Sequence, residues 1–106
     1  MASSAEIKGR INSLLDGVSA DVASLPSLGE TWDSTPEKQR FVWDIEWSEQ
    51  MRRLESLDQY YRAGAMTPEQ NSRYRELLQK LKAELPILRR LDLELPSVSL
   101  DGERAA

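Results

Sequence analysis

The feature that most constrains the fold is a helix stop followed within three residues by a helix start. A helical pattern of apolar residues runs up to Ala63, and Gly64 suits the left-handed conformation that ends many helices. The segment 67–70 (TPEQ) then offers a capping threonine, a proline at the first helical position and a glutamine at capping-box spacing. Two long helices joined by so short a connection fold back on each other. The sequence therefore predicts an antiparallel helical hairpin.

The predicted hairpin helices cover about residues 36–63 and 68–94. The first begins at Thr35-Pro36, which pairs a good N-cap with a proline favoured in the first turn. Pro86 lies inside the second, so we expect that helix to be kinked or broken there. Folding the hairpin about its turn places Glu55 near Arg75. The facing apolar stripes are Trp43, Trp47, Met51, Leu54, Leu57 and Tyr61, and Tyr74, Leu77, Leu78, Leu81, Leu85 and Leu88.

An amphipathic helix is predicted before the hairpin, over about residues 4–23. Ser3 and Glu6 have capping-box spacing. Apolar residues then recur at steps of three and four, namely Ile7, Ile11, Leu14, Leu15, Val18 and Val22. We expect residues 24–35 to form a mobile linker and residues 97–106 a mobile tail. The prediction is one all-α domain over 1–106, like a three-helix bundle, with the first helix packed on the hairpin.

Composition excludes several classes of function. The net charge is −4, but residues 36–95 carry eleven acidic and eleven basic side chains, so the excess negative charge lies at the two ends. Such a chain lacks the basic surface that nucleic acids or anionic membranes require. It has no cysteine and no histidine, which removes thiol chemistry, the commonest metal ligand and the commonest general base. We expect no cofactor, no nucleic acid, no membrane partner and a cytoplasmic location.

Two pairs of carboxylates are the strongest candidates for chemistry. Glu46 with Glu49, and Glu55 with Asp58, are similar to the E-x-x-E and E-x-x-D pairs of the MazG-type all-α nucleotide pyrophosphohydrolases. That resemblance implies magnesium-dependent hydrolysis. Here, however, both pairs belong to one predicted helix, and their spacing of nine residues turns them to opposite sides. We therefore interpret them as a solvated charged face and expect no catalytic or metal-binding residue.

The first hairpin helix is apolar nearly all round near its start, because Phe41, Val42 and Ile45 lie outside its main stripe. A helix of this kind is buried on all sides. The first helix could cover these residues as plain core, or they could form an aromatic-rich partner surface. Trp32 could be a plug over the core or an exposed recognition residue. The candidate partner-binding residues are Phe41, Val42, Ile45, Trp32, Leu91 and Leu95.

These observations predict a non-catalytic protein–protein interaction module, such as a small accessory subunit, adaptor or assembly factor, that acts by helix-on-helix docking. The expected partner is another protein or a second copy of the chain. A small regulator that binds and blocks another protein or a nucleic-acid enzyme is the alternative. The metal-dependent pyrophosphohydrolase is a more distant one.

Overall fold

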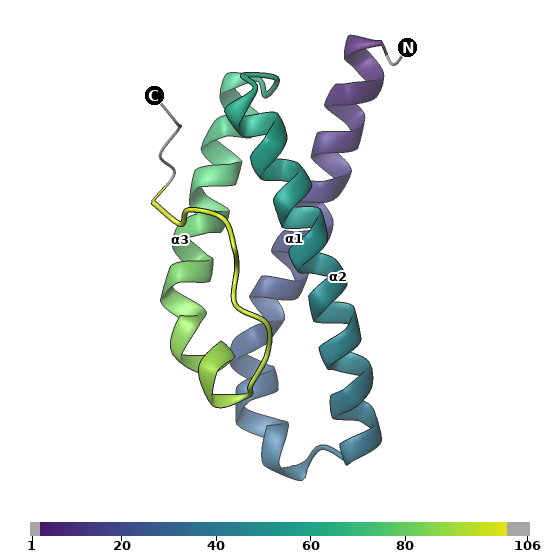
Figure 1. Ribbon diagram of the computed structural model, residues 1–106, viewed down its shortest axis with the longest axis vertical. Helices are drawn as coiled ribbons and strands as arrows, with labels where there is room; N and C mark the ends of the chain where they lie inside the picture. Colours follow the sequence, from purple (N-terminus) through teal and green to yellow (C-terminus); the bar gives the residue numbers. More distant parts are fainter. Residues whose placement is uncertain (1–2, 102–106) are drawn as a thin grey trace.

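The computed structural model describes residues 3–101 and is an all-α bundle of three long helices (Figure 1). Helix α1 covers Ser4–Thr31, a short 3-10 turn, η1, covers Trp32–Ser34, α2 covers Glu37–Arg62 and α3 covers Pro68–Arg90. The molecule measures 45 × 27 × 18 Å along its principal axes. The predicted fold class is confirmed.

The turn between α2 and α3 is built as the sequence predicts. Gly64 has a φ of 72°, and its backbone N–H donates to the Tyr61 carbonyl. At the start of α3, the Thr67 side chain accepts from the backbone N–H of Gln70, and the Gln70 side chain accepts from the backbone N–H of Thr67. Helix α2 starts at Glu37, with Pro36 at the capping position and without a side-chain cap, so the N-cap prediction for Thr35 is wrong.

Helix α1 is longer than predicted, because it continues through most of the expected linker at 24–35. Its apolar stripe runs on after Val22 through the buried Leu25. Gly29 is also buried, and the Arg90 guanidinium donates a 2.8 Å hydrogen bond to the Gly29 carbonyl. A β-carbon at Gly29 would lie 2.9 Å from that guanidinium, so glycine permits the close approach. Packing against α3 thus outweighs the local penalties of Pro26 and Gly29.

Helix α1 is the central element, since it packs closely along both α2 and α3. Polar pairs mark its contacts with each. Gln50 of α2 donates to Asp21 at 2.8 Å, and Arg73 of α3 forms an ion pair with Asp16 at 2.7 Å. Helices α2 and α3 meet near their turn and diverge away from it (Figure 1). The hairpin therefore does not close on itself along its length, and α1 holds its two arms together.

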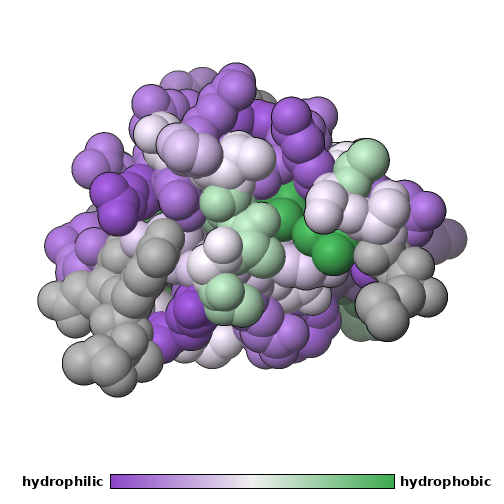
Figure 2. All heavy atoms as spheres, turned by 90° about the horizontal axis from the view of Figure 1, so that it is seen from above, coloured by the Kyte–Doolittle hydropathy of each residue, from purple (hydrophilic) through white to green (hydrophobic). Residues whose placement is uncertain are grey.

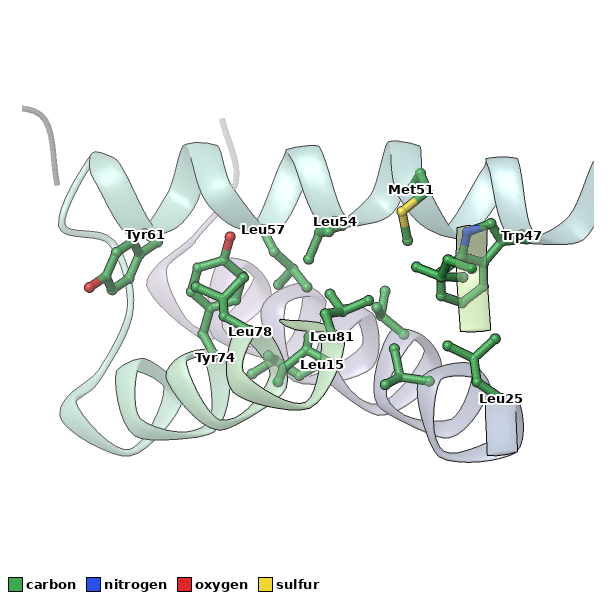
Figure 3. Close-up of a cluster of buried hydrophobic side chains, with 14 of the residues drawn as sticks. Leu15, Leu25, Trp47, Met51, Leu54, Leu57, Tyr61, Tyr74, Leu78 and Leu81 are labelled. Atoms are coloured by element: carbon green, nitrogen blue, oxygen red, sulfur yellow. The ribbon is translucent and has the colours of Figure 1, made fainter. Parts of the chain in front are cut away.

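The core lies between α2 and the other two helices (Figure 3). Each helix turns its predicted stripe inward, and the buried side chains include Ile11 and Leu15 of α1, Trp47 and Leu54 of α2, and Leu81 of α3. Tyr61 and Tyr74 pack at the turn end with ring centroids 5.0 Å apart. At roughly 1.5–3 kcal/mol for each large apolar side chain removed from water, this shared core is the main source of stability.

The chain after α3 forms an extended segment, residues 91–101, that we call the strap. It runs back between α2 and α3, where the two helices diverge (Figure 1). Leu93 is 5% exposed, and Val98 and Leu100 pack against the core. The Trp47 indole N–H donates to the Glu94 carbonyl at 2.8 Å. The strap is thus a structural part of the bundle.

Two predictions about this region need correction. Helix α3 ends at Arg90, not near residue 94. A kink or a break was expected at Pro86, and α3 continues through this residue without a break. Residues 97–101 of the predicted tail pack on the bundle, and Lys82 forms an ion pair of 2.9 Å with Asp101. Residues 102–106 of that tail lie outside the described part of the chain. The physical cause is burial, because the apolar side chains Leu93, Val98 and Leu100 of the strap pack against the core.

The predicted proximity of Glu55 and Arg75 is also not observed as an ion pair. Glu55 pairs with Arg52 on its own helix at 3.1 Å, and Arg75 donates to the Tyr61 hydroxyl at 3.2 Å. Each of the two side chains thus has another partner, Glu55 one turn away on its own helix and Arg75 on a tyrosine nearer the turn.

Candidate protein-binding surface

The first half of α2 carries large apolar side chains on two opposite sides. Trp43 and Trp47 point toward the core, with ring centroids 6.5 Å apart. Phe41, Val42 and Ile45 point away from it and are 64%, 47% and 47% exposed. We call these three residues, together with the exposed Lys38 and Glu49, the outer face of α2.

This exposure contradicts the interpretation of Phe41, Val42 and Ile45 as plain core. Helix α1 was the expected cover, but it lies on the Trp47 side of α2, where Gln50 contacts Asp21. The strap runs between α2 and α3 (Figure 1). Neither element therefore reaches over the outer face, and its three large apolar side chains remain in water.

A hollow next to the outer face joins three of the predicted site residues. Trp32, Phe41 and Leu91 line it together with the strap residue Leu93. Arg40 forms its wall and is held in place by three contacts. Its guanidinium donates to the Thr35 carbonyl at 3.0 Å and to the Asp33 carbonyl at 3.1 Å, and lies 5.4 Å from the centre of the Trp32 ring.

The six predicted residues thus fall into different environments. Val42 and Ile45 are on the open outer face, and Phe41 links that face to the hollow. Trp32 is half-buried against the core, as the plug interpretation predicts. Leu91 is only 5% exposed, so it belongs to the core and offers little surface. Leu95 is 44% exposed and lies on the strap.

Sequence reasoning missed the part that the strap plays in this surface. Leu93 lines the hollow, and Glu94 binds α2 through its backbone carbonyl to Trp47 and through its carboxylate to Arg52. The hydrogen bond that the Arg52 guanidinium donates to the Glu94 carboxylate raises the pKa of Arg52. A usable signal was present, because apolar and polar residues alternate through 91–95, as in an extended segment with one buried face.

Three of the four candidate carboxylates of α2, namely Glu49, Glu55 and Asp58, contact neighbouring side chains. Asp58 accepts a hydrogen bond from the Tyr74 hydroxyl at 2.9 Å and pairs with Arg62 at 2.6 Å. Burial of Tyr74, reinforced by the Asp58 charge, raises the pKa of its phenol. Glu49 lies 3.9 Å from Arg53. Among residues 3–101, no group of three or more carboxylates is placed to hold a metal ion.

The end of the molecule that carries the α2–α3 turn differs from the outer face. Viewed from the end where the α2–α3 turn lies, the molecule is mostly hydrophilic, with a small apolar area near the middle (Figure 2). The start of α2 is at the opposite end (Figure 1). In the described part of the chain, none of the helices is both long enough and apolar enough to cross a membrane.

Fold and surface together define a class: a three-helix bundle, closed by a C-terminal strap, with one apolar helix face left open. No protein family, no curated protein and no solved structure matches this chain.

Proposed function

We propose that this protein is a non-catalytic interaction module that binds another protein chain through the outer face of α2. The observation that carries the proposal is the simultaneous exposure of Phe41, Val42 and Ile45, which are neighbours on one helix face. Single exposed apolar residues are common, whereas a contiguous group of large ones marks an interaction site.

The bundle supports this role by presenting the face rigidly. The opposite side of the same helical turns is anchored through Trp47 and Met51, which are essentially fully buried. A partner that docks on the outer face therefore meets a preformed surface, which lowers the entropic cost of binding. This arrangement suits an accessory subunit, adaptor or assembly factor.

The experiment compares an Ile45→Asp variant with a matched Ala83→Asp variant, which adds the same carboxylate to an exposed position of α3. Proteins that bind the wild-type chain in its native host are quantified by affinity capture and mass spectrometry. We expect Ile45→Asp to lose them and Ala83→Asp to keep them, while circular dichroism shows both variants folded. Equal capture by both variants contradicts the proposal.

A further inference from the structure

We propose that the occupant of the outer face is a second copy of this chain, bound with the two α2 helices antiparallel around a two-fold axis. The inference rests on the proposed function and names the partner. It starts from the order of residues on the face: Lys38, Val42, Ile45 and Glu49 follow each other at steps of four, three and four. That spacing keeps them in one narrow stripe along the helix.

Two copies of this stripe are complementary in charge when they lie antiparallel. Its two ends carry opposite charges, with Lys38 toward the start of α2 and Glu49 toward its middle, and its centre is apolar. A two-fold axis midway between Val42 and Ile45 sets Val42 against the partner's Ile45, and Ile45 against the partner's Val42. The same operation sets Lys38 against the partner's Glu49, twice in each dimer. In an isologous interface every such contact occurs in pairs.

The charges also select the antiparallel arrangement. A parallel pair in register would set Lys38 against the partner's Lys38 and Glu49 against the partner's Glu49. Like charges so placed repel each other, and complementary potentials fix the register of an interface. Both groups are available, because Lys38 and Glu49 are exposed, and the 3.9 Å contact of Glu49 with Arg53 is long for an ion pair.

Phe41 adds apolar area at one flank of the stripe. A two-fold axis perpendicular to the helices keeps the Phe41 side chains of both copies on the same side of the interface, where each extends toward the partner's Ile45. The apolar surface involved is small compared with that of stable dimers, which bury roughly 1,200–2,000 Å². We therefore expect a reversible dimer with a micromolar dissociation constant.

The test is sedimentation equilibrium of the full chain at low salt, over a range of concentrations. Lys38→Glu and Glu49→Lys are each expected to weaken dimerisation about tenfold, because each replaces two attractive pairs by two repulsive ones. Lys80→Glu and Glu76→Lys, at exposed positions of α3, change the net charge equally and should leave the dimer unchanged. An equimolar mixture of Lys38→Glu and Glu49→Lys should form a heterodimer of wild-type affinity, since every facing pair is again opposite in sign.

The outcomes separate this inference from the proposed function. A wild-type chain that stays monomeric, or a mixture that does not recover affinity, overturns the antiparallel dimer. If Ile45→Asp nevertheless loses proteins captured from the host, the outer face still binds a partner. In that case only the identification of the partner as a second copy of the chain is wrong. If Ile45→Asp keeps every association of the wild type, both proposals fail.

Discussion

The indole nitrogen of Trp47 donates a 2.8 Å hydrogen bond to the backbone carbonyl of Glu94, which joins the middle of α2 to the strap. Trp47 is fully buried, so this carbonyl has a partner that water cannot easily replace. The side chain of the same residue, Glu94, forms an ion pair with Arg52 of α2. One backbone carbonyl and one side chain thus hold the strap against α2.

Replacing Trp47 by Phe should lower the free energy of unfolding by about 1–3 kcal/mol, because the Glu94 carbonyl loses its donor and the smaller ring leaves space in the core. Chemical denaturation followed by circular dichroism measures the change. A matched Trp43→Phe variant, altered at a half-buried tryptophan for which the structure gives no hydrogen bond to the strap, should lose less. Equal losses in both variants would show that the hydrogen bond to Glu94 contributes little.

The burial of the strap predicts opposite outcomes for two of its leucines. Leu93 is 5% exposed and Leu95 is 44% exposed. Leu93→Ala should reduce the free energy of unfolding by about 2–4 kcal/mol, as at other core leucines. Leu95→Ala should change it by less than about 0.5 kcal/mol, as at surface sites. Similar losses at both positions, or none, would mean that the strap does not pack in this way in solution.

Two helix ends have the same geometry with different residues. Gly64 after α2 and Asp92 after α3 both have positive φ, at 72° and 57°. Glycine tolerates this conformation, while a residue with a β-carbon is strained in it. Asp92→Gly should therefore stabilise the protein by about 0.5–1 kcal/mol and Gly64→Ala should destabilise it by about 1–2 kcal/mol. Thermal unfolding tests both, and stabilisation by Gly64→Ala would contradict the argument.

The sequence predicted those parts of the fold that depend on local chemistry. Gly64 and the capping box at Thr67 and Gln70 act through neighbours within a few residues, so their roles can be read from spacing alone. The inward stripes of the helices were likewise predicted from periodicity. The caps have their partners within a few residues, and the position of a stripe follows from the period of its own helix, whichever element later covers it.

Predictions failed where the outcome depends on distant partners. Gly29 and Pro26 signal a helix end locally, but the contact of Gly29 with Arg90, 61 residues away, favours continuation. The predicted helix at about 68–94 extended past the true end at Arg90, because the burial of Leu93 on the bundle depends on elements that are distant in the sequence. The exposure of Phe41, Val42 and Ile45 followed from where α1 packs, which periodicity does not specify.

The buried phenol of Tyr74 predicts a loss of stability at alkaline pH. Its raised pKa means that the folded state favours the neutral phenol. This contribution is complete below the pKa of an unfolded tyrosine, about 10, and is lost as the pH rises from there toward the folded-state pKa. Unfolding measured between neutral pH and strongly alkaline pH should show a steeper loss in the wild type than in Tyr74→Phe, whose side chain cannot ionise. Parallel curves would contradict the assignment.

Gln70 links the start of α3 to α1 and supports the last prediction. Its side-chain amide N–H groups donate to the Lys8 carbonyl at 3.1 Å and to the Asn12 side-chain oxygen at 2.9 Å, while its oxygen accepts from the Thr67 backbone. The residue is only 2% exposed. A carboxylate in its place would keep the cap but would face two acceptors without a proton to donate.

Gln70→Glu should therefore lower the free energy of unfolding by about 2–4 kcal/mol at neutral pH. This is the usual cost of a buried polar group without a hydrogen-bond partner, here a carboxylate that faces two acceptors. Burial raises the pKa of the new carboxyl, so the loss should shrink as the pH falls toward about 4, where the group is protonated and can donate one hydrogen bond. The same substitution at the exposed Gln79 is the control and should be nearly neutral at every pH. If the two variants have equal stability across this range, the amide of Gln70 does not hold α1 against α3.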